Sequence, residues 1–393
     1  MAEAWLSIIG LGEDGPEGLT GASRAALARA EVIFGGPRHL ALVGAGARGQ
    51  AWPVPFDIAP VLARRGQPVA VLASGDPFWF GAGGSLSRVL GPDEWRAYPA
   101  PSVFSLAAAR LGWRLEETTT LGLHAAPLAA LRPVLQPGAR IIATLRDGAA
   151  VAVAAKWLTA QGLGAARLWV MEALGGPGER IRPGHAESLD ASGIGPLVAL
   201  AIEAPAQGPF LPRTPGRAEA LFAHDGQITK SPVRAVTLAA LAPRAGEVLW
   251  DLGAGSGSVS VEWCLAGGRA IAVEARADRL DNIRANIDSF GLAGRMEALQ
   301  GTLPGAVEGL EMPQAVFVGG GFSMALMERL VSLPAGTRLV VNTVTLETEA
   351  LVGACQRQHG GSLMRMDFAQ AEPLGGSRGW HAARPVVQWS VVL

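Results

Sequence analysis

The chain contains 393 residues, a length that favours two or three domains because a single hydrophobic core rarely extends so far. Hydrophobic residues make up 49% and charged residues 17%, which excludes a disordered chain and predicts globular domains. The formal net charge of −1 excludes a general positive field of the kind that holds a nucleic-acid backbone, so we expect no nucleic-acid partner.

The cysteines and the start of the chain indicate a reducing compartment and no membrane. Cys264 and Cys355 are isolated and far apart, so they form neither a disulfide framework nor a metal-binding pair, and we expect no metal. The opening MAEAWLSIIGLGEDG has no basic region, and no apolar run reaches about 18 residues. We therefore expect a cytoplasmic protein.

The first half of the chain alternates apolar, strand-like runs with alanine-rich helical stretches, a pattern typical of α/β folds. We expect strands at 5–10, 32–34, 68–74, 140–145, 167–174 and 196–203. Helices are expected between them, for example at 21–30 and 148–161.

A proline-rich segment divides the chain. APAQGPFLPRTPGR, residues 204–217, contains four prolines and no periodic pattern, which predicts a linker. We accordingly expect a first domain at 1–206, with subdomains at roughly 1–101 and 102–206. We expect a linker at 207–217 and a second domain at 218–393.

The second half begins with an expected helix at 231–243, in which Ser231 is a natural N-cap and Pro232 suits the first turn. Strands are expected at 247–253, 269–275, 295–301, 314–320, 337–344 and 385–393. Together they predict one doubly wound sheet with a ligand crevice at the carboxyl ends of its strands.

A glycine loop follows the first strand of this sheet. In DLGAGSGS the glycines at 253, 255 and 257 let the backbone turn tightly beside a ligand at the start of a helix. A dinucleotide site would need glycine where Ser258 stands, which argues against an NAD-dependent oxidoreductase. With Asp251 ahead of it, the loop resembles that of class I S-adenosylmethionine-dependent methyltransferases. The resemblance implies that Glu274, at the end of the next strand, accepts the ribose hydroxyls.

The expected acceptor of this second half is large and flat. Amino-methylating nucleic-acid enzymes carry an Asp/Asn-Pro-Pro-aromatic motif after the fourth strand, whereas this chain has VFVGGGF, with Gly320 at the centre of the three glycines. Side-chain-free backbone leaves room for a broad acceptor, and we expect Gly320 to border it.

Two loops of the first half also contain glycine after expected strands. They read GLGEDGPEGLT, from Gly10, and SGDPFWFG, from Ser74. A strand-ending turn would account for the second loop alone. Together the loops resemble those of the tetrapyrrole methylase family, although Glu13 stands where that family usually has proline. The resemblance implies that S-adenosylmethionine is bound by Gly10, Gly12, Gly75, Asp76, Ser102, Ser105 and Thr144, with Asp76 near its ammonium group.

The fusion of these two halves resembles the precorrin-6Y C(5,15)-methyltransferase (decarboxylating) family of cobalamin biosynthesis over nearly the whole chain. The resemblance implies a tetrapyrrole methylase fold followed by a class I Rossmann-like methyltransferase domain, with two S-adenosylmethionine molecules per chain. It implies methylation of precorrin-6B at carbons 5 and 15 and decarboxylation of the ring C acetate, giving precorrin-8. The first half would methylate carbon 5, and the second would methylate carbon 15 and decarboxylate. The alternative is a non-catalytic, tetrapyrrole-binding first half.

The same resemblance suggests further site residues in the second half. Gln227 and Thr229 belong to a ligand-covering segment, and Gly301 and Thr302 would flank the adenine. Precorrin carboxylates need cationic partners, and the candidates are Arg234, Arg378 and Arg384. Asn342 is expected at the acceptor site and His381 in proton transfer. By analogy with related domains, we expect a homo-oligomer.

Overall fold

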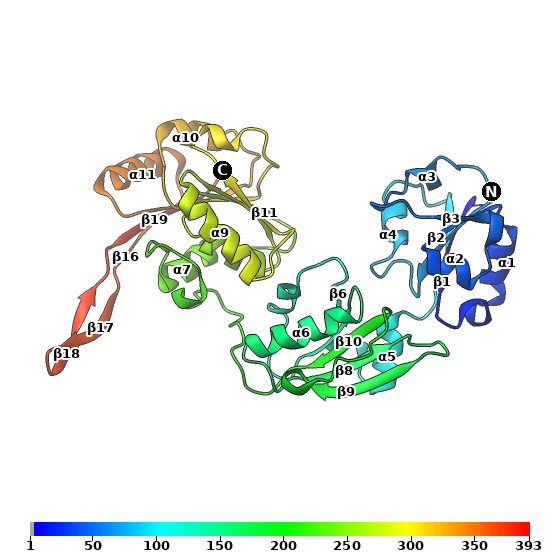
Figure 1. Ribbon diagram of the computed structural model, residues 1–393. Helices are drawn as coiled ribbons and strands as arrows, with labels where there is room; N and C mark the ends of the chain where they lie inside the picture. The colour runs from blue at the N-terminus through cyan, green and yellow to red at the C-terminus, as the bar shows by residue number, and fades with distance from the viewer. Residues whose placement is uncertain (1–3) are drawn as a thin grey trace. The chain divides into compact units, whose positions relative to one another are not determined.

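The computed structural model describes residues 4–393 and divides the chain into two compact units (Figure 1). The first unit holds the residues up to Ala126 together with Val134–Pro209. The second holds Phe210–Leu393 together with the short segment Pro127–Pro133. Among the residues described, no helix combines the length and apolarity that crossing a bilayer requires.

The first unit begins with a fully parallel sheet of order β3-β2-β4-β1-β5. Its strands are β1 (Leu6–Leu11), β2 (Val32–Gly35), β3 (Gly49–Ala51), β4 (Val69–Ser74) and β5 (Trp95–Tyr98). Helices α1 (Gly21–Arg29) and α2 (Pro37–Leu42) cover one face, and α3 (Ala59–Leu62) and α4 (Ala82–Ser87) cover the other. The central strands are buried on both faces, which explains why they read as continuous apolar runs.

A second, mixed sheet completes the first unit, in the order β6-β7-β10-β8-β9. Its elements are β6 (Thr118–Gly122), β7 (Arg140–Thr144), β8 (Arg167–Glu172), β9 (Arg180–His185), β10 (Val198–Glu203), α5 (Val103–Leu111) and α6 (Ala149–Ala160). Helix α5 packs Phe104, Ala107 and Ala108 against this sheet. It begins at Ser102, whose hydroxyl accepts a hydrogen bond from the Ser105 N–H at 3.1 Å.

The second unit contains a seven-stranded sheet of order β13-β12-β11-β14-β15-β19-β16, in which the first five strands are parallel. The strands are β11 (Val248–Leu252), β12 (Arg269–Glu274), β13 (Met296–Gln300), β14 (Ala315–Val318), β15 (Arg338–Thr343), β16 (Ser362–Met366) and β19 (Val386–Val392). On one face lie α7 (Ser231–Leu241), α8 (Ser258–Leu265) and α9 (Ala277–Ser289); on the other lie α10 (Met324–Leu330) and α11 (Leu346–His359). The predicted α/β class and doubly wound sheet are confirmed.

The sequence did not predict the hairpin of β17 (Ala369–Leu374) and β18 (Ser377–Ala382). The hairpin projects from the sheet between β16 and β19 (Figure 1). Nearly all of its residues are exposed, so it lacks the alternation of apolar and polar residues that identifies a half-buried strand.

The segment expected to be a linker, 207–217, is partly built into the second unit. Leu211 joins the core under α7 and α8, and Arg217 is only 6% exposed. The predicted N-cap at Ser231 is wrong by one residue. Lys230 occupies the cap, and the Ser231 hydroxyl instead donates to the carbonyl of Gly216 at 2.8 Å.

Candidate active sites

A cavity of about 1260 Å³ lies in the second unit. Its wall includes the loops that follow β11 and β14, Asn342 near the end of β15, and residues of the covering segment 226–231. Strands β11 and β14 are neighbours whose chain connections leave in opposite directions across the sheet. The cavity thus occupies the crevice where doubly wound sheets bind their ligands.

The loop after β11 can be made only with glycine. Gly253, Gly255 and Gly257 have φ values of +67°, +59° and +69°, in the left-handed region. A Cβ atom at Gly253 would collide with the backbone of Gly320, and one at Gly257 would press on Met296. The backbones of the two loops therefore approach each other closely at Gly253 and Gly320, and both glycines line the cavity.

Two buried acids hold this loop in shape. The Glu274 carboxylate accepts from the Gly255 N–H at 2.8 Å and from the Arg276 N–H at 3.0 Å. One oxygen of Asp251, Oδ2, accepts from the Ser260 N–H at 3.1 Å and from the Ser260 hydroxyl at 2.7 Å. The other, Oδ1, is buried without a hydrogen-bond partner, as is the Ser256 hydroxyl. Burial raises the pKa of Asp251 to about 6.

The structure separates the predicted residues of this half into two sets. Those that line the cavity are Gln227, Thr229, Gly253, Gly255, Gly320, Asn342, His381 and Arg384. Those outside its lining are Asp251, Gly257, Glu274, Gly301, Thr302 and Arg378. The first set comes from distant parts of the chain, which the sheet brings to one edge.

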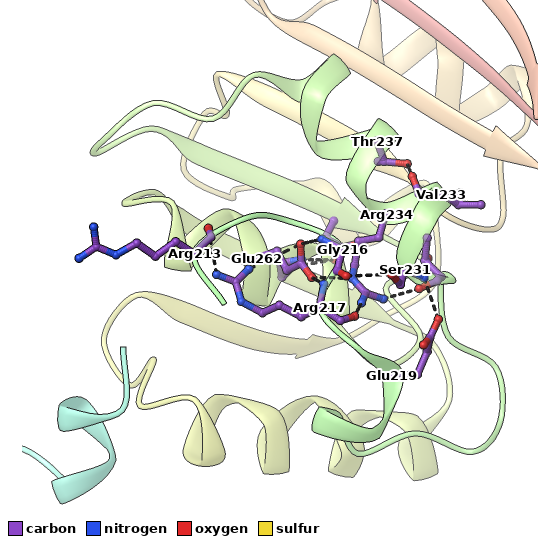
Figure 2. A network of polar contacts seen from close by, with 12 residues as sticks. Arg213, Gly216, Arg217, Glu219, Ser231, Val233, Arg234, Thr237 and Glu262 are labelled. Carbon is purple, nitrogen blue, oxygen red and sulfur yellow. Dashed lines mark hydrogen bonds and ion pairs between the residues drawn. The ribbon is translucent and has the colours of Figure 1, made fainter. Parts of the chain in front are cut away.

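The expectation that Arg234 binds substrate is wrong, because its side chain is fully buried. Its Nε donates to Glu262 at 2.8 Å, and its two terminal nitrogens donate to the carbonyls of Thr229 and Arg217 (Figure 2). The ring of Phe222 lies 4.6 Å from the centre of the guanidinium group. No face of this cation remains for a ligand.

Glu262 completes the buried network and was missed by the sequence analysis. Its carboxylate accepts from the backbone N–H groups of Gly216 at 2.8 Å and Arg217 at 2.9 Å (Figure 2). An acid inside the apolar helix SVSVEWC was the available signal, since a buried charge needs a partner. The network ties the chain from Gly216 to Thr229 onto α7 and α8, and so supports the wall of the cavity.

Asn342 reaches the cavity from a second buried network. Its Nδ2 donates to the Thr237 hydroxyl at 2.8 Å, and its Oδ1 accepts from Gln388 at 2.9 Å. Gln388 also donates to the Thr237 hydroxyl, at 3.1 Å. These contacts fix which end of the amide carries the hydrogens.

The first unit has its own cavity, of about 450 Å³. Among its predicted residues, Gly12, Gly75, Ser102 and Thr144 line this cavity, whereas Gly10, Asp76 and Ser105 do not. A Cβ atom at Gly10 would collide with the Gly75 carbonyl, so glycine is needed there for packing. Asp76 accepts from the Phe78 N–H at 2.9 Å, the arrangement of a simple Asx turn.

A polar cluster on the wall of this cavity was also missed. Arg38 forms an ion pair with Glu13, and its Nη2 lies 2.8 Å from His39 Nε2 and 3.1 Å from the Ser74 hydroxyl. Burial and the neighbouring charge of Arg38 lower the pKa of His39 to about 4, so the imidazole is neutral at pH 7. The signal was GGPRHL, which begins at the last residue of β2.

The arrangement of possible metal ligands and the burial of the two cysteines can be stated for the described residues. Residues 4–393 contain no group of three or more His, Cys, Asp or Glu side chains placed to hold a metal ion. Both cysteines are buried, and burial raises the pKa of Cys264 to about 12, which keeps it a thiol.

Both halves of the chain match known families. Residues 6–190 match the family described as Tetrapyrrole (Corrin/Porphyrin) Methylases, and residues 220–393 match the one described as Precorrin methyltransferase domain. A solved structure of the C-terminal domain of precorrin-6Y C5,15-methyltransferase from Rhodobacter capsulatus is 62% identical, with a TM-score of 0.46. It covers 47% of this chain and 100% of that one.

Two curated relatives are similar over almost their whole length. Precorrin-6Y C(5,15)-methyltransferase (decarboxylating) from Sinorhizobium sp is 46% identical and covers 99% of this chain and 97% of the relative. The protein of the same name from Mycobacterium tuberculosis (strain CDC 1551 / Oshkosh) is 40% identical and covers 98% of each chain. The chain belongs to the precorrin-6Y C(5,15)-methyltransferase (decarboxylating) family, S-adenosylmethionine-dependent enzymes of cobalamin biosynthesis.

Proposed function

We propose that this chain methylates precorrin-6B at carbons 5 and 15 and removes the carboxylate of the ring C acetate, giving precorrin-8. In this proposal the first unit methylates carbon 5, and the second unit methylates carbon 15 and decarboxylates. The supporting observation is that each unit has its own glycine-lined cavity, and that the two halves match different methyltransferase families.

The residues at both cavities fit S-adenosylmethionine, which supplies a methyl group from a positively charged sulfur, and we propose one molecule per unit. In the second unit, the close approach of Gly253 to Gly320 leaves a side-chain-free cradle. The Ser256 hydroxyl, buried without a hydrogen-bond partner, lies in the same loop and lines the cavity. In the first unit, Gly12 and Gly75 border the cavity with Ser102 and Thr144.

The second cavity suits a broad acceptor that needs to be held rather than activated. A partly reduced tetrapyrrole has enamine-like carbons that are already nucleophilic, so orientation at near-attack distance supplies several kcal/mol of the barrier. Gly319–Gly321 would lie against the macrocycle, Asn342 would fix one edge of it, and Arg384 would pair with a peripheral carboxylate.

Decarboxylation needs a proton as well as a binding site. When the bond from the acetate methylene to its carboxylate breaks, the electron pair passes into the macrocycle and the methylene must gain a proton. His381 lines the cavity, and its Nδ1 lies 3.9 Å from a Glu372 carboxylate oxygen on the facing strand. We assign the proton delivery to His381, whose ring can both carry and release a proton.

Substitution of one glycine in each unit tests the division of labour. Gly255→Leu and Gly75→Leu each place a side chain on a backbone with positive φ at one cavity only. We expect Gly255→Leu to abolish methylation at carbon 15 and spare carbon 5, and Gly75→Leu to do the reverse. Product analysis by mass spectrometry and NMR reports both positions.

Calorimetric titration with S-adenosylhomocysteine measures the number of cofactor sites per chain. We expect two sites in the unmodified chain and one in each variant. Gly84→Leu and Gly305→Leu are matched controls, because a Cβ atom at either position meets nothing within 4 Å. A single site, erased by Gly255→Leu, would instead favour the alternative in which the first unit only holds the tetrapyrrole.

A further inference from the structure

The cluster of Glu13, Arg38, His39 and Ser74 has no part in the function described so far. Arg38 is held on two sides. Its Nη1 faces Glu13, while its Nη2 is fixed by His39 Nε2 at 2.8 Å and by the Ser74 hydroxyl at 3.1 Å. The same His39 Nε2 lies 2.9 Å from the Ser74 hydroxyl oxygen. Ser74 immediately precedes Gly75, so this guanidinium lies beside the proposed cofactor loop.

Few charges face this cavity. Its charged lining residues are Glu13, Arg38 and Arg146, and Arg146 already pairs with Asp147 at 3.0 Å. Aromatic side chains form another part of the lining, namely Trp52, Phe56, Trp79, Phe80 and Phe104. Flat apolar surfaces beside a single well-oriented arginine suit a flat macrocycle with carboxylates at its rim.

We propose that Arg38 binds a peripheral carboxylate of the tetrapyrrole in the first unit, and that Glu13 occupies the guanidinium until that carboxylate displaces it. The proposal rests on the proposed function, in which this cavity takes the precorrin. It also gives a role to Glu13, the residue that departs from the usual first loop of the tetrapyrrole methylase family.

The geometry and the charge balance both allow this exchange. The side chains of Arg38 and Glu13 both line the cavity and are 36% and 19% exposed. Arg38 Nη1 itself is buried, so a carboxylate arriving through the cavity reaches it only as Glu13 moves away. His39 and Ser74 keep Nη2 in place while the partner of Nη1 changes. One carboxylate replaces another, so the half-buried cation always has a partner of opposite charge.

A purely structural ion pair would behave differently. If the pair only held the loop from Gly10 to Gly15, removing either charge would impair the enzyme to a similar extent. If Glu13 competes with the substrate, the two substitutions have opposite effects on substrate affinity. Arg38→Gln weakens binding, and Glu13→Gln strengthens it.

Steady-state kinetics of carbon 5 methylation by the full chain, with precorrin-6B as the varied substrate, make this test. We expect Arg38→Gln to raise KM at least about tenfold, the scale of a lost hydrogen bond to a charged group. Arg38→Lys should recover part of that loss. Glu13→Gln should lower KM about two- to fivefold, the scale of a partly exposed ion pair.

Two measurements control for folding and for general electrostatics. S-adenosylhomocysteine should bind Arg38→Gln, Arg38→Lys and Glu13→Gln with the stoichiometry and affinity of the unmodified chain. Arg146→Gln, which removes the other cation of the cavity lining, should change KM much less than Arg38→Gln.

The proposal is overturned if Glu13→Gln raises KM as Arg38→Gln does, or if Arg38→Gln leaves KM unchanged. Failure of the proposed function gives a different result, because Gly75→Leu would then leave carbon 5 methylation intact. In that case the Arg38 proposal falls with it.

Discussion

Asp251 is a fully buried carboxyl group with one satisfied oxygen and one unsatisfied oxygen. Desolvation, partly opposed by the hydrogen bonds from Ser260, raises its pKa from 3.8 to about 6. Because the folded protein then holds the proton more tightly than the unfolded chain, this group favours folding while it is protonated. Its contribution to the free energy of unfolding is complete below about pH 4 and is lost as the pH rises through about 6.

Asp251→Asn tests this linkage, since the amide keeps an oxygen for Ser260 and carries no charge. We expect the variant to gain stability relative to the unmodified protein between pH 4 and pH 7, by up to about 3 kcal/mol. Urea unfolding of the second unit, followed through the fluorescence of the buried Trp250 and Trp263, measures the difference at each pH. A constant difference across this range would rule the linkage out.

At the scale of elements, the network around Arg234 and Glu262 converts an irregular segment into a wall of the second cavity. A buried ion pair is weak evidence of stability as a whole, but removing one partner leaves an uncompensated charge. The segment also has few other buried anchors before α7, among them Leu211 and Phe222. Its order therefore depends on Glu262.

Glu262→Gln should destabilise the second unit by about 3–5 kcal/mol, because Arg234 keeps its charge. It should also weaken S-adenosylhomocysteine binding there and speed tryptic cleavage after Arg213 and Arg217. Glu308→Gln is the matched control. It breaks the exposed pair with Arg329, whose side chain is 57% accessible, and should change stability by less than about 1 kcal/mol. Equal effects of the two substitutions would refute the role given to Glu262.

The elements show what the sequence could and could not predict. All six strands expected in the second half are present. Five of them read as largely buried apolar runs, whereas the edge strand β13 has only one buried residue. Strand β9 was missed because none of its residues is buried, and the hairpin of β17 and β18 because nearly all of its residues are exposed. Arg234 was misassigned because its burial depends on Glu262, 28 positions away, which no local pattern reveals.

The residues that line the two cavities also divide into those that the sequence could predict and those that it could not. The glycine loops were predictable, since a positive φ beside a ligand restricts the residue type. Arg38 and His39 were not, because α2 brings them to Ser74 only through the packing of a parallel sheet, across 36 and 35 positions of sequence. Residues that act through tertiary contacts leave little local trace.

At the scale of the whole molecule, the start of the second unit decides whether it can exist as a separate fragment. A fragment of residues 210–393 keeps Gly216 and Arg217, which donate to Glu262, whereas a fragment of residues 218–393 loses both. We expect the shorter fragment to be less stable by about 3 kcal/mol, the scale of two hydrogen bonds to a buried charge. Urea unfolding of the two fragments measures this, and equal midpoints would contradict it.

The position of β19 has a consequence for biosynthesis. Both sheets of the first unit are complete once β10 has been made, so this unit can fold while the ribosome is still producing the rest. In the second unit, β19 lies between β15 and β16, and β16 has no other partner in the sheet. Strand β16 must therefore wait for the last strand along the chain before it can join the sheet. During that interval β15 is an open edge, and chaperones have their clearest reason to bind there.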